Sequence, residues 1–129
     1  MKIITPKQIL IVHEHEIKKH GGSSGIRDVG MLESAIGRPF ATFAGKDLYI
    51  TIFLKAGALV QSLVKNHPFV DGNKRTALVS AIVFLKMNNY ILSISQDKSV
   101  DFVMDVANKN LSVDQISLWF KKHSKKITQ

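Results

Sequence analysis

Apolar residues recur every three or four positions along most of this chain, and this helical period is the feature that most restricts its fold. One long run follows Asp47, which can cap a helix, and ends near His67-Pro68. Its apolar positions are Leu48, Ile52, Phe53, Ala56, Leu59, Val60 and Leu63. A second run opens at about Gly72 and reaches Asn88-Asn89, with apolar residues at Ala77, Leu78, Ala81, Ile82, Phe84 and Leu85. Spacing of this kind buries one helix face, so both segments are predicted to be central helices.

Capping signals predict four further helices. Thr5-Pro6-Lys7-Gln8 combines an N-cap, a proline in the first turn and a capping-box glutamine, which indicates a helix over about residues 6–20, ended by Gly21-Gly22. A short helix is expected around Met31–Gly37, before Pro39. Two more are expected over about 99–109 and 112–122, the second opening with a capping box. The fold class is therefore all-α, a compact single-domain bundle of about six helices over residues 1–129.

Three segments do not follow the helical period. Residues 38–46 carry two aromatic side chains without a clear repeat and are predicted to form an exposed flap loop. Residues 91–95 alternate weakly, but a lone strand needs a partner, so we expect an extended loop. The basic segment 121–126 is expected to be a solvated, frayed helix end.

The charge balance restricts the partners. The formal net charge is +8 and the chain has no cysteine. An excess of this size attracts acidic partners, and the absence of cysteine suits a reducing compartment. No signal peptide or membrane-spanning segment is recognisable, so we expect a cytoplasmic protein that does not associate with membranes.

A dense polar group lies between the two long apolar runs, where His67, Asp71, Gly72, Asn73, Lys74 and Arg75 fall within nine residues. The first turn after Gly72 offers free backbone N–H groups that suit an anion. Lys74 and Arg75 oppose the helix macrodipole there, at a cost of a few tenths to about 1 kcal/mol, unless a bound polyphosphate compensates. Asn73 would fix either a phosphate oxygen or the loop itself.

The remaining polar residues suggest group transfer. Asp71, a carboxylate in a basic setting, would hold Mg²⁺ that bridges phosphate oxygens. His67 would take the proton from an attacking hydroxyl, and Phe69 would anchor the loop in the core. Two other interpretations stay open: a structural helix start, with Asp71 as the cap and His67 bonded to a carbonyl, and a DNA-binding helix led by Lys74 and Arg75.

The segment His67-Pro68-Phe69-Val70-Asp71-Gly72-Asn73-Lys74-Arg75 resembles the Fic motif, His-x-Phe-x-(Asp/Glu)-Gly-Asn-Gly-Arg-x-x-Arg, and more closely its Doc branch. The resemblance extends to the early Leu10-Ile11-Val12-His13, to Gly21-Gly22 and to residues 25–35. It implies His67 as the general base, Asp71 as the Mg²⁺ ligand, and Gly72, Asn73, Lys74 and Arg75 as the loop that binds the phosphates of ATP. The flap near residues 40–46 would help to align the target.

Two departures from the Fic motif bear on the reaction. Lys74 stands where adenylyltransferases of the family have glycine, and Leu78 stands where they have a second arginine. The Doc branch shares both, so the resemblance implies a toxin that transfers the γ-phosphoryl group of ATP to a hydroxyl of elongation factor Tu, with AMP transfer as the alternative. No glutamate here follows a serine or threonine at the spacing of the family's inhibitory helix. We therefore expect that a separate acidic antitoxin controls the protein. We also expect no direct binding of nucleic acid.

Overall fold

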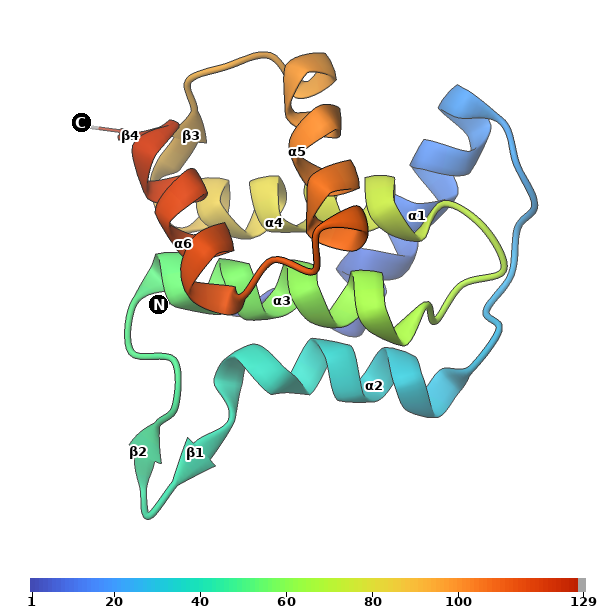
Figure 1. The fold of residues 1–129 in the computed structure, drawn as a ribbon. Helices are drawn as coiled ribbons and strands as arrows, with labels where there is room; N and C mark the ends of the chain where they lie inside the picture. The colour runs from blue at the N-terminus through green and yellow to red at the C-terminus, as the bar shows by residue number, and fades with distance from the viewer. Residues whose placement is uncertain (128–129) are drawn as a thin grey trace.

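The computed structural model describes residues 1–127. Within this range six α-helices form the body of the molecule (Figure 1): α1 (Pro6–His20), α2 (Val29–Gly37), α3 (Ile52–Asn66), α4 (Asn73–Met87), α5 (Gln96–Asn108) and α6 (Val113–Lys122). The all-α prediction is confirmed. A 3₁₀ turn, η1 (Arg38–Phe40), follows α2, and two small antiparallel pairs join β1 (Thr42–Phe43) to β2 (Lys46–Asp47) and β3 (Tyr90–Leu92) to β4 (Ser124–Lys126).

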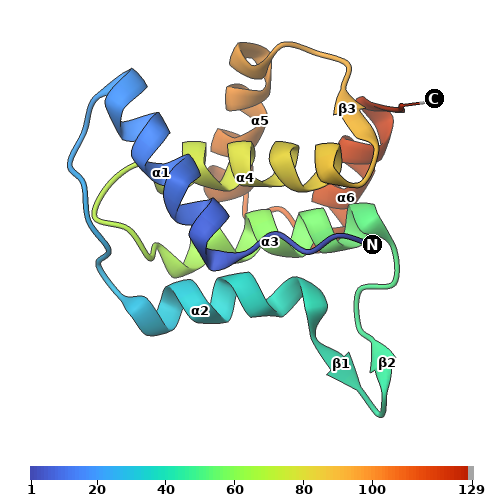
Figure 2. The ribbon, with the colours of Figure 1, turned by 180° about the vertical axis from the view of Figure 1, so that it is seen from behind.

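Helices α3 and α4 run side by side through the middle of the molecule, and the other helices pack around them (Figures 1 and 2). α6 and α2 pack against α3, while α1 and α5 pack against α4. Gly57 allows the close approach of α6, because a side chain there would meet the Val113 carbonyl oxygen at 2.8 Å. The turn that joins α3 to α4 therefore lies on a rigid support.

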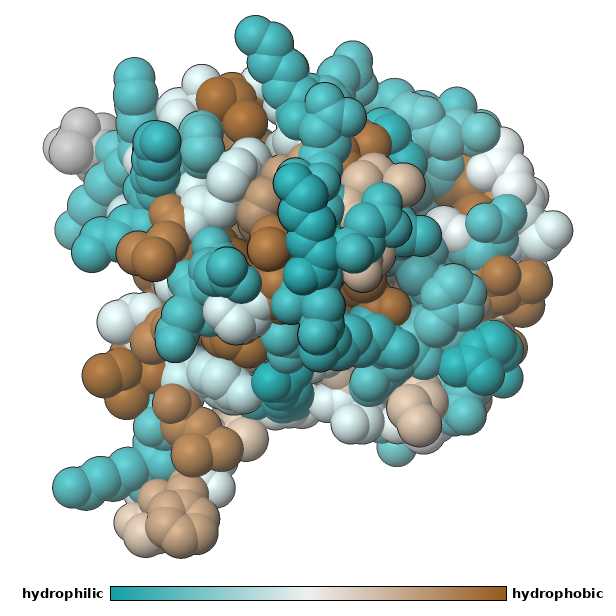
Figure 3. Space-filling view, viewed as in Figure 1, coloured by the Kyte–Doolittle hydropathy of each residue, from teal (hydrophilic) through white to brown (hydrophobic). Residues whose placement is uncertain are grey.

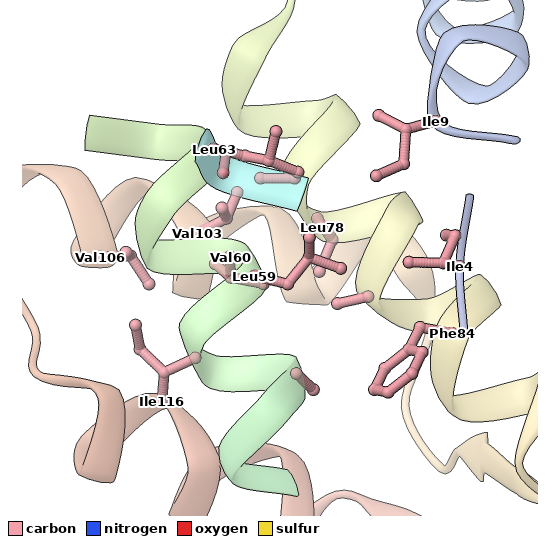
Figure 4. Packing of buried hydrophobic residues seen from close by; sticks show 14 of the residues in the cluster. Ile4, Ile9, Leu59, Val60, Leu63, Leu78, Phe84, Val103, Val106 and Ile116 are labelled. Atoms are coloured by element: carbon pink, nitrogen blue, oxygen red, sulfur yellow. The ribbon is translucent and has the colours of Figure 1, made fainter. Parts of the chain in front are cut away.

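The core gathers side chains from the N-terminal segment and from all six of these helices, and Figure 4 shows part of it. The residues labelled there are Ile4, Ile9, Leu59, Val60, Leu63, Leu78, Phe84, Val103, Val106 and Ile116. Each is at most 2% exposed. Burial of one such side chain contributes roughly 1.5–3 kcal/mol, so this cluster is the main stabilising feature of the bundle. No helix within residues 1–127 has the length and apolar character needed to cross a membrane.

The predicted caps of α1 and α6 are confirmed. Thr5 and Gln8 form one capping box, and Ser112 and Gln115 form the other. The starts of two other helices lie earlier than predicted, because Asp28 caps α2 and Ser95 caps α5. In each case a polar side chain closer to the preceding loop accepts the bond from the helix N–H.

Three sequence-based expectations are wrong. Asp47 does not cap α3; Thr51 does, while Asp47 lies in β2 and accepts a bond from the buried Lys55 ammonium. Leu48 is accordingly 56% exposed and lies outside the helix. Residues 90–92 form a strand, because residues 124–126 of the basic end supply its partner. The end of that segment is therefore a strand, although residues 121 and 122 do finish α6.

The expected flap is present in part. Arg38–Phe40 is a 3₁₀ turn packed on the bundle, and Pro39 within it is buried. Residues 42–47 form a hairpin that projects from the body (Figures 1 and 3) and carries Phe43, which is 75% exposed. The loss of helical period in this segment thus reflects a turn followed by a hairpin.

Candidate functional site

The six residues between α3 and α4 form a tight turn that begins at His67. This residue is exposed and adopts the left-handed conformation, with φ 49° and ψ 53°, directly after the last residue of α3. A residue other than glycine adopts that conformation at some cost, and such outliers cluster at functional sites. The ring of His67 makes no hydrogen bond to any residue of the described chain. The interpretation that a carbonyl satisfies this ring is therefore not supported.

The segment before α2 holds this strained turn in place. Arg27 donates from Nε to the His67 carbonyl at 2.7 Å and from Nη2 to the Asn66 carbonyl at 2.9 Å. An isolated β-bridge pairs Ile26 with Phe69, and the Val70 N–H donates to the Gly25 carbonyl at 3.0 Å. Sequence reasoning missed Arg27, because no local pattern shows that residues 25–28 lie against the turn.

The base of the turn is buried and fully bonded. Phe69 is 0% exposed. The Asn73 amide accepts from the Phe69 N–H at 2.9 Å and donates to the Phe69 carbonyl at 3.0 Å. Of the two roles that sequence analysis left open for Asn73, the structure shows the one in which its side chain fixes the loop. The expected packing role of Phe69 is also confirmed.

His13 of α1 supports the same base. Its ring stacks on Phe69 with centroids 3.9 Å apart and an angle of 8° between the planes. Its Nε2 lies 2.8 Å from the Asp71 carbonyl oxygen and must donate to it, because a carbonyl only accepts. His13 is only 2% exposed. A histidine on the apolar face of α1 was the available signal for this contact, but its partner lies 58 residues away in the sequence.

Asp71 carries an exposed carboxylate that backbone N–H groups hold in one position. Oδ1 accepts from the Gly72 N–H at 2.8 Å, and Oδ2 accepts from the Ser23 N–H at 3.2 Å. Gly22 leaves room for this carboxylate, since a Cβ there would lie 2.6 Å from Oδ2. Neither bond caps α4, so the interpretation of Asp71 as a helix cap is wrong. The glycine pair at 21–22 thus has a role beyond ending α1.

The Asp71 carboxylate fits a divalent cation that is shared with a ligand. Each of its oxygens retains a lone pair beyond the single bond it accepts. Within residues 1–127 no cluster of three histidine, aspartate or glutamate side chains could hold a metal ion by itself. Mg²⁺ is commonly held in this way, by one or two carboxylates together with phosphate oxygens and water.

The start of α4 is open to an anion. Gly72 is the N-cap, with φ 74°, and no side chain in the described part of the chain caps the helix. The first turn contains the cations Lys74 and Arg75 and no acidic residue. Free N–H groups and two cations together favour a negatively charged ligand. The structure thus brings Gly72, Lys74 and Arg75 together beside Asp71.

Arg75 has one acidic neighbour. Its Nε lies 3.4 Å from Oε1 of Glu16, a residue of α1 that is 2% exposed. Lys74 is half-buried and makes no ion pair within residues 1–127. Further along the helix, Ala77, Leu78 and Ala81 are buried in the core. A helix buried on this side does not suit insertion into a DNA groove, which argues against the DNA-binding interpretation.

Comparison with known proteins gives consistent results. Residues 3–85 match a family model described as the Fic/DOC family. The chain is 42% identical over 99 residues to the "Toxin Doc" of Mycolicibacterium smegmatis (strain ATCC 700084 / mc(2)155), covering 75% of this chain and 76% of that protein. It is 32% identical over 117 residues to the "Protein kinase doc" of Escherichia phage P1, covering 91% of both chains.

Proposed function

Since the chain belongs to the Fic/DOC family, we propose that it is the toxin of a type II toxin–antitoxin system and transfers the γ-phosphoryl group of ATP to a hydroxyl of a protein. The names of the two relatives, a toxin and a protein kinase, support both halves of this proposal. The observation that carries it is the open N-terminus of α4, which presents Lys74 and Arg75 next to the exposed His67 and Asp71.

Each residue has a defined part in the proposed reaction. His67 takes the proton of the attacking hydroxyl, whose oxygen bonds to the γ-phosphorus while the bond from that phosphorus to the bridging oxygen breaks and ADP leaves. Lys74, Arg75 and the free N–H groups after Gly72 bind the phosphates. Mg²⁺ held by Asp71 and the phosphate oxygens would neutralise the charge that develops on the transferred group.

The choice of phosphoryl over AMP transfer rests on two positions. Lys74 places a cation where AMP-transferring relatives of this family have glycine, and this larger side chain should reshape the site for the phosphates. Leu78, which replaces their second arginine, is 1% exposed and belongs to the core. The helix turn after Arg75 thus supplies no cation for the other phosphates. AMP transfer, the alternative, would break the bond between the α- and β-phosphates instead.

The hairpin β1–β2 is the proposed contact for the target protein, with elongation factor Tu as the proposed target. Its exposed apolar side chains include Phe43 at 75%, and Leu48 and Ile50 follow it at 56% and 74%. Exposed apolar groups on a projecting hairpin suit transient contact with another protein. The buried Lys55 fixes the base of the hairpin by hydrogen bonds to the Asp47 carboxylate and the Tyr49 carbonyl.

An acidic antitoxin is the proposed partner that keeps the toxin inactive. The outer face of α1 has a mainly apolar hollow of about 410 Å³ that Leu10 and Ile11 line and that two lysines, Lys7 and Lys18, border together with Glu14 and His15. Ile11 is 60% exposed there. An amphipathic segment with acidic flanks would bury this surface and pair with the lysines. We expect Ile11→Glu to leave the toxin active but to prevent neutralisation by its antitoxin; full neutralisation of that variant would exclude this surface.

Growth arrest tests the role of His67. Induced expression of the native chain should arrest bacterial growth, and His67→Ala should not. His67→Asn is the second variant, because asparagine tolerates the left-handed conformation of this position but its amide cannot act as the base. Val70→Ala, which changes an exposed residue of the same turn, is the matched control and should still arrest growth. Growth arrest by a folded His67 variant would contradict the mechanism.

A further inference from the structure

Glu16 is a buried acid in a strongly basic part of the molecule. It is 2% exposed and lies one turn before the end of α1, where the last turn carries Lys18, Lys19 and His20. A buried carboxylate is costly unless cations and hydrogen bonds compensate for its lost hydration. A negative charge near a helix C-terminus is also disfavoured by the helix dipole. Glu16 therefore depends on the cation-forming side chains around it.

Three side chains surround this carboxylate. Oε1 lies 3.4 Å from Arg75 Nε and 3.7 Å from His20 Nε2, while Oε2 lies 3.1 Å from His15 Nδ1. The two histidines lie on α1 itself, and their side chains are 68% and 32% exposed for His15 and His20. Arg75 is the partner contributed by another helix. The ion pair between Glu16 and Arg75 thus joins α1 to the first turn of α4.

The contact with Glu16 leaves the two terminal guanidinium nitrogens of Arg75 free. Only Nε faces Glu16, and Nη1 and Nη2 have no hydrogen-bond acceptor within the described residues. The Arg75 side chain is 25% exposed. A guanidinium held at Nε by a buried carboxylate has its plane oriented, and its two terminal nitrogens can still bind phosphate oxygens in the bidentate mode.

We infer that Glu16 is a positioning residue, which acts through Arg75 to set the affinity of the loop for the phosphates of ATP. This inference rests on the proposed nucleotide-binding function of the loop. Glu16 itself does not touch the ligand. Its carboxylate also partly balances the charge of Lys74 and Arg75 while the site is empty, and so lowers the cost of keeping two cations at a helix start.

A double-mutant cycle on the binding of Mg·ATP, followed by titration calorimetry, tests the inference. Glu16→Ala should raise the dissociation constant about five- to tenfold, as expected for loss of one well-oriented charge-assisted contact. In an Arg75→Ala background, Glu16→Ala should leave the dissociation constant almost unchanged, because the guanidinium through which Glu16 acts on the phosphates is already absent. Glu14→Ala, which removes an exposed glutamate of the same helix, is the matched control and should leave affinity unchanged.

The conservative variant separates positioning from folding. Glu16→Gln keeps an acceptor for Arg75 Nε and should weaken binding only about twofold; if Glu16→Ala does not fold, this variant serves in the same cycle. An equal loss of affinity in both Arg75 backgrounds, or tighter binding by the Glu16 variants, would overturn the inference. Absence of Mg·ATP binding by the native chain would refute the nucleotide-binding function itself, and the inference with it.

Discussion

Replacing Asn73 with alanine should destabilise the protein by about 2–6 kcal/mol, because the side chain bonds both backbone groups of Phe69. These bonds measure 2.9 and 3.0 Å, and they lie where Asn73 is 4% and Phe69 0% exposed. Both backbone groups are buried, so a donor and an acceptor that remain unsatisfied would cost about 1–3 kcal/mol each.

Urea denaturation followed by circular dichroism measures this loss. With a slope of about 2 kcal/mol per molar urea, the midpoint should fall by about 1–3 M. Asn66→Ala is the control at the other side of the turn. That side chain makes one bond, from Nδ2 to the Met31 carbonyl at 3.0 Å, in an exposed setting where water can replace it. Its loss should cost less than about 1 kcal/mol.

The same variant distinguishes two roles for Asn73. If the amide fixes the loop, Mg·ATP binding and stability should weaken together, because Phe69 and the residues that follow it lose their fixed positions. A variant as stable as the native chain that no longer bound Mg·ATP would contradict the role of Asn73 in fixing the loop. It would show that the amide serves the ligand directly.

Two further changes test the carboxylate of the site. Gly22→Ala should lower stability by about 1–3 kcal/mol and weaken Mg²⁺-dependent ATP binding, because a side chain at φ +121° would lie 2.6 Å from Asp71 Oδ2. Gly21→Ala is the control: this position has φ +82° and no atom within 4 Å of an added Cβ, so the change costs only backbone strain. Equal ATP binding by the two variants would contradict the predicted clash between residue 22 and the Asp71 carboxylate. Asp71→Ala should weaken ATP binding in the presence of Mg²⁺ but much less in its absence, and calorimetry with and without the ion checks this.

Much of the helical fold could be predicted because its signals are local. The capping boxes at Thr5 and Ser112 each need only residues three positions apart, and both form as predicted. Asp47 was misassigned because Lys55, which comes from the helix that Asp47 was expected to cap, binds its carboxylate. A local signal cannot show which of two contacts an aspartate will make.

Strand β3 shows the other limit. Residues 91–95 alternate too weakly to indicate a strand by themselves. The partner of β3, strand β4, lies more than thirty positions later in a segment that reads as a charged tail. These two segments can pair only because α5 and α6, which lie between them in the sequence, bring β4 back beside β3. A short segment cannot be assigned as a strand until the segment that pairs with it is known.

The site could be predicted as far as it is contiguous. His67 and Asp71 share one turn with the start of α4, so their nearness follows from the sequence. The residues that hold this turn and the first turn of α4 are His13, Glu16 and Arg27, which come from α1 and the segment before α2. Only packing of α1 against α4 and of residues 25–28 against the turn brings them there.

Intact mass spectrometry of elongation factor Tu incubated with this protein, Mg²⁺ and ATP is the decisive test of the proposed phosphoryl transfer. We expect a mass gain of about 80 Da with the native chain and none with His67→Asn, as phosphoryl transfer requires. A gain of about 329 Da would show AMP transfer and contradict the role assigned to Lys74 and Leu78. An equal gain with the native chain and the His67 variant would contradict the assignment of the base.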